Sequence, residues 1–215
     1  DKRDNIDKDD FEQIKSVESL ASMSMSAGKD SSIQQNSRQD NELKLPEADE
    51  STGALVYRYP IAVPPGRAGL QPEITLIYNS QQGEEGSLVG YGWKLSVPYI
   101  ERLNKYGSQQ LYTSNTFTSS LAGELIDLGN GSFGPKVETG EFLSYSFTGN
   151  VWTIKDKRGT IYKYGATAQA RQDNPSDATK VYKWMLEEIR DTNDNYIRYE
   201  YFKDQGQIYP SRIVY

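Results

Sequence analysis

The side chains available for chemistry in this 215-residue chain are carboxylates, hydroxyls and amines, because the sequence contains no histidine and no cysteine. These absences exclude a thiol nucleophile, a Ser-His-Asp triad and a zinc site of the usual Cys/His kind. The adjacent Glu187 and Glu188 would point to opposite faces of a strand, so they cannot face each other across a glycosidic bond as a catalytic pair must. We therefore predict no catalytic residue.

An Asp/Asn-rich stretch over residues 191–195 resembles the first half of a calcium-binding loop. Such a loop needs glycine at its sixth position and glutamate at its twelfth. Here those positions are Tyr196 and Phe202. We interpret the stretch as a hairpin turn and predict no metal site.

The segment Gly90-Tyr-Gly92-Trp93 begins like a phosphate-binding loop, but no Gly-Lys-Ser/Thr follows and no Gly-x-Gly-x-x-Gly pattern is completed. Glycines on alternate strand positions let an aromatic ring or another backbone approach closely. We expect a packing role, with Trp93 buried beside Gly90 and Gly92. No cofactor is predicted.

Charge and aromatic content divide the chain near residue 50. Residues 1–50 carry 7 Lys/Arg and 13 Asp/Glu, the remainder carries 17 of each, and Phe11 is the only aromatic residue before residue 51. An acidic segment with so few large apolar side chains cannot bury enough apolar surface to offset the conformational entropy that ordering would cost. We predict a disordered acidic tail over residues 1–49, with a short helix near residues 10–21 as the alternative, and one folded domain over residues 50–215.

Composition also bears on partners and location. The folded part is neutral and has no basic patch, which argues against nucleic acid. No apolar run approaches the length of a membrane-spanning helix, so no membrane span is predicted. No signal peptide is visible at the amino terminus.

From Thr52 onward the sequence is typical of an all-β protein, with turn signals about every 8–12 residues. Gly129-Asn130-Gly131 and Gly149-Asn150 are residues that tolerate the positive φ angles of tight hairpins. We predict antiparallel hairpins with roughly ten to fourteen strands in all. The polar stretch over residues 166–180 is interpreted as a long loop.

The strongest hairpin signal covers residues 182–201, around the turn at residues 191–195. Apolar and aromatic residues alternate with polar ones on both arms, as in strands with one buried face. The pattern places Trp184, Leu186 and Ile189 opposite Ile197, Tyr199 and Tyr201.

Residues 59–72, Tyr-Pro-Ile-Ala-Val-Pro-Pro-Gly-Arg-Ala-Gly-Leu-Gln-Pro, form a segment that we call the strap. Its prolines remove backbone donors and favour extended geometry, so it should run along a sheet edge or across a sheet face. Gly66 and Gly69 would supply its turns. Arg67 would then be free to pair with a carboxylate or with backbone carbonyls.

Three motifs in residues 53–103 together resemble one family. Pro-Pro-Gly-Arg of the strap, Tyr-Asn-Ser at residues 78–80 and Gly-Tyr-Gly-Trp at residues 90–93 have the order found in the SpvB-type amino-terminal domain. That domain opens the SpvB virulence proteins and the B components of insecticidal toxin complexes, and it is related to Rhs/YD-repeat proteins. Residues 152–165 and 184–201 resemble YD-repeat units, with Asp194 in place of the usual glycine. The structural motif residues are Pro64, Pro65, Gly66, Arg67, Tyr78, Asn79, Ser80, Gly90, Gly92, Trp93, Trp152, Gly159, Trp184, Asp191, Asn195, Tyr199 and Tyr201.

The resemblance covers residues 50–215 and implies the start of an Rhs/YD-like β-shell that encloses or presents a toxic carboxy-terminal region. It implies a secreted or cell-surface bacterial protein, continuing beyond Tyr215. Its partners would be downstream Rhs/YD repeats and the toxic region of the same polypeptide, together with a pore-forming delivery component. The ADP-ribosyltransferase region of SpvB lies far downstream, and no Glu-x-Glu occurs here, so the chain is predicted not to be an enzyme.

Two other functions remain open from the sequence alone. Exposed tyrosines could stack on sugars, as in a free-standing β-sandwich that binds glycans or acts as a cell-surface adhesin. A hydrolase would need two carboxylates that converge in a pocket.

Overall fold

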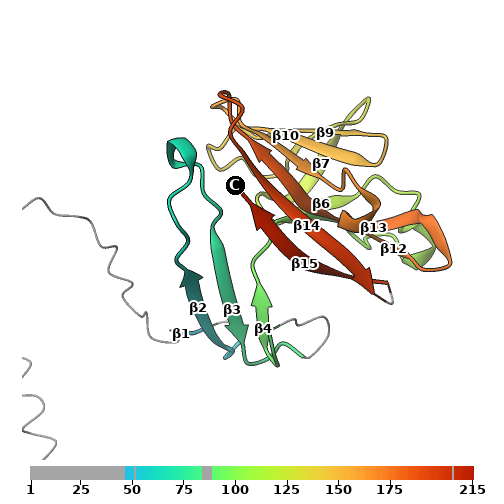
Figure 1. Cartoon of the computed structure of the whole chain (residues 1–215). Helices are drawn as coiled ribbons and strands as arrows, with labels where there is room; N and C mark the ends of the chain where they lie inside the picture. Colours follow the sequence, from blue (N-terminus) through green and yellow to red (C-terminus); the bar gives the residue numbers. More distant parts are fainter. Residues whose placement is uncertain (1–46, 51, 84–88, 205) are drawn as a thin grey trace, which may run out of the picture. The chain divides into compact units, whose positions relative to one another are not determined.

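The chain is all-β in the computed structural model, which describes residues 47–50, 52–83, 89–204 and 206–215. Its strands form two antiparallel sheets (Figure 1). The described part contains fifteen strands, one more than the predicted range, and three short 3₁₀ helices. None of the helices in these residues is long and apolar enough to cross a membrane.

The smaller sheet has the order β1-β2-β3-β4. Its strands are β1 (Glu47–Ala48), β2 (Leu55–Ile61), β3 (Ile74–Asn79) and β4 (Trp93–Leu95). β1 lies within residues 1–49, the stretch predicted to be a disordered tail, and it pairs with β2. The rest of that tail, with the alternative helix near residues 10–21, lies outside the described residues.

One face of the smaller sheet carries a row of aromatic rings. Tyr57, Tyr78 and Trp93 are register partners across β2, β3 and β4. The ring centroid of Trp93 lies 6.2 Å from that of Tyr57 and 5.3 Å from that of Tyr78. The side chains of these three strands are all half-buried or exposed, so the fully buried core lies elsewhere.

The strap begins inside β2. Its first three residues still pair with β3, and Pro60 lies opposite Thr75. β1 reaches only Leu55 and Val56, so the missing N–H of Pro60 interrupts no ladder on that side. The strap then leaves the sheet and forms η1 (Arg67–Gly69).

The larger sheet closes on itself. Strands β5 to β11 pair in sequence order, and β11 and β5 both pair with β13, which makes a closed antiparallel barrel of eight strands. The barrel strands are β5 (Tyr99–Arg102), β6 (Phe117–Ser119), β7 (Gly123–Gly129), β8 (Ser132–Pro135), β9 (Ser144–Thr148), β10 (Val151–Lys155), β11 (Ile161–Tyr164) and β13 (Asp177–Arg190). A short helix η2 (Ser108–Gln110) lies between β5 and β6.

The long strand β13 is also where the sheet branches. Residues 183–185 pair with β5, whereas residues 188–190 pair with β14 (Tyr196–Asp204). β14 then pairs with β15 (Gln207–Val214), and this hairpin continues the sheet beyond the barrel (Figure 1). Within the described residues, the outer edge of β15 has no partner strand.

The barrel interior is filled with aromatic side chains. Trp152 and Trp184 are both 0% exposed. The centroid of the Trp152 ring lies 4.6 Å from that of Phe147, 4.9 Å from that of Phe117 and 5.0 Å from that of Phe133. Rings at these distances contribute packing and edge-to-face attraction beyond area burial. The core of the described residues is therefore a packed aromatic cluster.

The long loop predicted for residues 166–180 is wrong. This stretch contains η3 (Ala168–Ala170), β12 (Arg171–Asn174) and the start of β13, and β12 pairs with β13. β12 reads Arg-Gln-Asp-Asn and therefore gives no apolar alternation. It is held by backbone pairing and by an ion pair of 2.8 Å between Asp173 and Lys203 of β14.

The hairpin predicted over residues 182–201 forms only next to its turn. Ile189 faces Ile197 as predicted. Trp184, however, pairs with Ile100 of β5 on one side and with Arg171 of β12 on the other. The two arms diverge because β13 must also pair with β5 to close the barrel.

Candidate interaction site at the aspartate turns and the strap

Two five-residue turns share one hydrogen-bond pattern. At residues 156–160 the backbone N–H of Thr160 donates to Oδ1 of Asp156 at 2.9 Å, and at residues 191–195 that of Asn195 donates to Oδ1 of Asp191 at 2.9 Å. In both turns the N–H two residues after the aspartate donates to the same oxygen at 2.8 Å. The carboxylate thus holds each turn in place of a backbone acceptor. These are the turns of the two YD-like stretches.

The fourth residue of each turn is left-handed. Gly159 has a φ of +86° and Asp194 a φ of +64°. Asp194 therefore takes the conformation that the usual glycine would take, which Asp tolerates better than most residues. A Cβ atom at Gly159 would lie 3.0 Å from Cγ2 of Thr192, so the two turns lie side by side.

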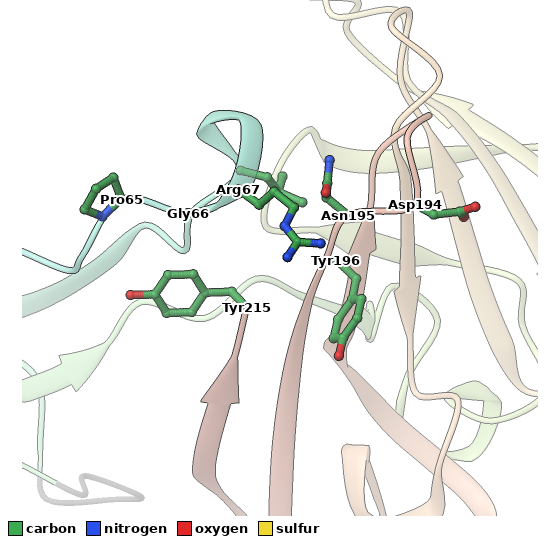
Figure 2. Close-up of a pocket in the computed structure, with 8 residues that line it drawn as sticks. Pro65, Gly66, Arg67, Asp194, Asn195, Tyr196 and Tyr215 are labelled. Atoms are coloured by element: carbon green, nitrogen blue, oxygen red, sulfur yellow. The ribbon is translucent and has the colours of Figure 1, made fainter.

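The second turn borders a pocket of about 290 Å³, which we call the strap pocket (Figure 2). It is lined by Pro65, Gly66, Arg67 and Leu70 of the strap, by Asp194, Asn195 and Tyr196 of the turn, and by Tyr215. Oη of Tyr215 donates a hydrogen bond of 3.2 Å to the carbonyl oxygen of Pro64. Segments far apart in the sequence thus meet at one place.

Arg67 supplies the positive charge of the strap pocket. Its side chain extends from the strap toward Asn195 and Tyr196 (Figure 2), and the residue is exposed. Its guanidinium has no hydrogen bond or ion pair with any residue that the structure describes. The carboxylate of Asp194 is turned away and pairs with Arg190 at 3.3 Å. The pocket therefore presents an uncompensated guanidinium.

The adjacent carboxylates Glu187 and Glu188 have separate environments. Glu187 is buried and accepts hydrogen bonds from N and Oγ1 of Thr167 at 2.8 and 2.6 Å. Burial acts to raise the pKa of Glu188, but hydrogen bonds from Arg190 and Arg198 outweigh it, so this pKa lies below its usual value. Among the residues described, no three acidic side chains gather as metal ligands would.

The predicted placement of the glycine-aromatic segment needs correction. Gly90 and Gly92 do not alternate along a strand but lie in the turn before β4, with φ angles of +112° and +74°. A Cβ atom at Gly92 would lie 2.7 Å from Cε2 of Tyr78, so the ring does approach closely. Trp93 is half-buried and not fully buried, because its sheet is only partly covered.

The Tyr-Asn-Ser motif ties the start of β2 to the end of β3. Oγ of Ser80 accepts a hydrogen bond of 2.9 Å from the backbone N–H of Leu55. Oδ1 of Asn79 accepts one of 2.9 Å from Gln81, and the backbone N–H of Asn79 donates to the carbonyl of Gly92 at 2.8 Å. The motif residues thus hold the smaller sheet together.

The other motif residues fall into two groups. Trp152, Trp184, Tyr199 and Tyr201 are buried in the barrel core, where Oη of Tyr201 donates to the carbonyl of Leu186. The strap pocket brings Pro65, Gly66 and Arg67 together with Asn195, beside the turn that Asp191 holds. The carbonyl of Pro64 accepts the hydrogen bond from Tyr215, another pocket residue. Sequence reasoning missed Leu70, Tyr196 and Tyr215 as pocket residues, because no local signal pairs the strap with this turn.

A model of one protein family matches most of the chain. The family, described as Salmonella virulence plasmid 65kDa B protein (SpvB), matches residues 49–144 and 138–212. The chain belongs to the SpvB family.

Curated relatives and solved structures agree with this assignment. The Mono(ADP-ribosyl)transferase SpvB of Salmonella typhimurium is 24% identical over 167 residues, which cover 64% of this chain and 28% of that protein. The solved N-terminal domain of SpvB from Salmonella typhimurium has a TM-score of 0.57 at 21% identity, over 67% of this chain and 59% of that one. The chain thus spans about 28% of the length of the curated SpvB proteins that it matches.

Tc toxin structures share the fold of this SpvB-family chain. The TcdB2-TccC3 crystal structure gives a TM-score of 0.62 at 24% identity, over 74% of this chain and 9% of that one. The structure of a Photorhabdus luminescens Tc holotoxin pore gives a TM-score of 0.62 at 25% identity, over 78% of this chain and 9% of that one. The SpvB-type fold therefore forms a small section of much larger toxin chains.

The aspartate turns predict a pH dependence for this SpvB-family domain. Hydrogen bonds from Asn195, then from the backbone of Asn193, lower the pKa of Asp191 below its ordinary 3.8 although burial opposes them. A lowered folded-state pKa gives stability that is present above the unfolded pKa and is lost as pH falls through the folded one. We expect Asp191→Ala to lower the melting temperature at pH 6, and the gap to wild type to close as pH falls below 3.8.

Thermal denaturation followed by circular dichroism from pH 6 downward measures this gap. Asp204→Ala, at an exposed carboxylate on β14, is the control and should show a small gap at every pH. A gap for Asp191→Ala that stays constant across the range would show that the carboxylate charge does not hold the turn.

Proposed function

We propose that this SpvB-family chain is a non-catalytic structural module of a secreted bacterial toxin. It would form part of a β-shell that encloses or presents a toxic region elsewhere in the same polypeptide. The likeness to the SpvB N-terminal domain and to Tc toxin chains makes it a toxin-associated structural domain. The proposal includes the shell role, downstream repeats and a toxic region in the same polypeptide, a pore-forming delivery component and an extracellular location.

The observation that carries the proposal is the contrast between a packed barrel and an open strand edge. The barrel interior is packed with Trp152, Trp184 and their neighbouring rings. At the other end of the sheet order, β15 has a backbone edge that no strand of the described residues pairs with. A packed barrel core next to an unpaired strand edge is expected of a domain whose sheet is continued by further strands.

The matching region of the relatives supports a structural role. The chain matches the N-terminal domain of SpvB, a protein that carries the name Mono(ADP-ribosyl)transferase. Because the match spans about 28% of that protein, the named activity need not reside in the matched part. Under this proposal the chain has no transferase activity of its own.

The open edge predicts that the chain self-associates as its concentration rises. Unpaired strand edges with apolar neighbours recruit other strands, and lysine on such an edge opposes this pairing. We expect sedimentation velocity to show oligomers as the concentration approaches ~1 mM. Ser211→Lys on exposed β15 should shift them toward monomer.

Ser146→Lys is the matched control, because Ser146 is also exposed but lies on β9, which has partner strands on both sides. It should associate as wild type does. A wild-type chain that stays monomeric at all these concentrations would be a self-contained domain, and the shell proposal would then fail.

A further inference from the structure

We propose that the strap pocket binds a carboxylate group on an acidic side chain of a peptide, with Arg67 as its anchor. The choice of a peptide rests on the same open β15 edge as the proposed function, whereas the choice of a carboxylate rests on Arg67. The binding site follows from the state of Arg67, from the way the strap holds it, and from the size and walls of the pocket.

The guanidinium of Arg67 has no hydrogen-bond acceptor among the described residues. Three other arginines of the described part are engaged: Arg212 pairs with Glu200, and Arg198 and Arg190 pair with Glu188, whereas Arg58 on β2 is exposed and has no ion pair with a described residue. Arg67 makes no such contact with a described residue, although it lies at the strap pocket. A planar guanidinium can donate two parallel hydrogen bonds to a carboxylate, which fixes both position and orientation.

The polar neighbours of Arg67 in the pocket are already satisfied. The Asn195 side-chain amide donates to Oδ2 of Asp191 at 2.8 Å, and the Asp194 carboxylate pairs with Arg190. Oη of Tyr215 donates to the Pro64 carbonyl. Since no acidic group of the turn faces Arg67 (Figure 2), an incoming anion would meet attraction without internal competition.

The strap holds Arg67 in a strained loop. Ala68 has a φ of +53°, a left-handed conformation that costs an L-residue about 1–2 kcal/mol. A Cβ atom at Gly66 would overlap the carbonyl oxygen of Leu70, so only glycine fits there. Leu70 packs against the barrel core and anchors the loop. Strain that the surrounding structure maintains is a frequent property of binding loops.

The size of the pocket selects a small group. About 290 Å³ is at the lower end of ligand pockets, which run from about 300 to 1,000 Å³. That space suits one side chain and is too small for a nucleotide cofactor. Pro65, Leu70 and the rings of Tyr196 and Tyr215 would contact the methylene part of an acidic side chain.

A peptide is favoured because the free edge of β15 leads to the pocket. β15 ends at Val214, and the next residue, Tyr215, lines the pocket. An extended peptide that adds to this edge would place a side chain beside Arg67. The strap pocket would then bind an acidic side chain in preference to a neutral one.

The experiment is a titration of the ¹⁵N-labelled chain with acetyl-Ala-Glu-Ala-amide, followed by NMR. We expect saturable shifts of the Arg67 Nε–H and of the Tyr196 and Tyr215 amides, with a millimolar dissociation constant. The neutral peptide acetyl-Ala-Gln-Ala-amide should bind at least about tenfold more weakly.

Variants separate the anchor from general charge. Arg67→Ala should abolish the shifts, and Arg67→Lys should weaken binding about threefold because it keeps the charge but loses the planar fork. Arg58→Ala removes another exposed arginine, on β2, and should change nothing. Circular dichroism checks that each variant is folded.

Several results would overturn the proposal. Equal binding of the glutamine peptide, or an equal loss in Arg58→Ala, would show that no specific carboxylate site exists. Tighter binding of inorganic phosphate or of glucuronate than of the glutamate peptide would assign the pocket to another anion. The glutamine peptide and the Arg67 variants distinguish a failure of this proposal from a failure of the shell proposal, because the self-association test changes β15 and leaves Arg67 unchanged.

Discussion

Trp152→Ala is expected to destabilise the barrel by about 3–5 kcal/mol, the range for removal of a buried Trp side chain. Trp152 is fully buried, and its ring contacts those of Phe117, Phe133 and Phe147. These partners come from β6, β8 and β9, so the neighbouring strands cannot close over the cavity without changing the barrel. Since domains are stable by only about 5–15 kcal/mol, the variant should be close to unfolded.

Substitution of each buried tryptophan by phenylalanine tests the contribution of its indole N–H group to stability. Nε1 of Trp152 is buried and has no hydrogen-bond partner among the described residues, whereas Nε1 of Trp184 donates to the carbonyl of Asn150 at 2.9 Å. Burying an unpaired donor costs about 1–3 kcal/mol, and Trp152→Phe removes that cost together with some packing. Trp184→Phe loses both packing and a hydrogen bond. We therefore expect Trp152→Phe to be the milder change.

Urea denaturation monitored by circular dichroism measures all three variants. The expected order of destabilisation is Trp152→Ala, then Trp184→Phe, then Trp152→Phe. If Trp152→Ala cost under about 1 kcal/mol, Trp152 would lie in a site able to relax around the deletion, unlike a packed barrel core.

The core was predictable because aromatic alternation is a local signal. In β10, Trp152 and Ile154 are buried and their neighbours are not, and in β14 Ile197, Tyr199 and Tyr201 follow the same period. The Asp/Asn and Gly residues of the turns likewise mark their positions directly, as at Asp191. The strands could therefore be predicted from alternation with a period of two, and the turns from their Asp, Asn and Gly residues.

What the sequence could not predict depends on partners distant along the chain. β12 has no apolar alternation and exists because β13 offers it an edge. Trp184 faces Ile100 instead of the β14 arm because barrel closure requires that pairing. The strap pocket joins Arg67 to Tyr196 and Tyr215 in the same way, through the fold and not through any spacing.

Gly165→Ala is the second change expected to have a large effect, about 2–5 kcal/mol, from backbone strain and a clash added together. Gly165 follows β11 with a φ of +63°, and its N–H donates to the carbonyl of Met185 at 2.9 Å. A Cβ atom there would lie 3.0 Å from Cγ of Trp184 and nearer still to Cδ1. The Trp184 ring is held in place, because its Nε1 donates a hydrogen bond to the carbonyl of Asn150 and the ring makes a T-shaped contact with that of Phe147.

Gly149→Ala separates the two causes. Gly149 has a similar φ of +60°, but a Cβ atom there would meet nothing within 4 Å. It should therefore cost only the left-handed strain, about 1–2 kcal/mol. Thermal and urea denaturation of both variants give the difference, which reports the clash of the added methyl group with the Trp184 ring and with Cγ of Arg171. Equal losses at Gly149 and Gly165 would mean that the indole has space to shift, and the barrel interior would then be less tightly packed than its ring distances indicate.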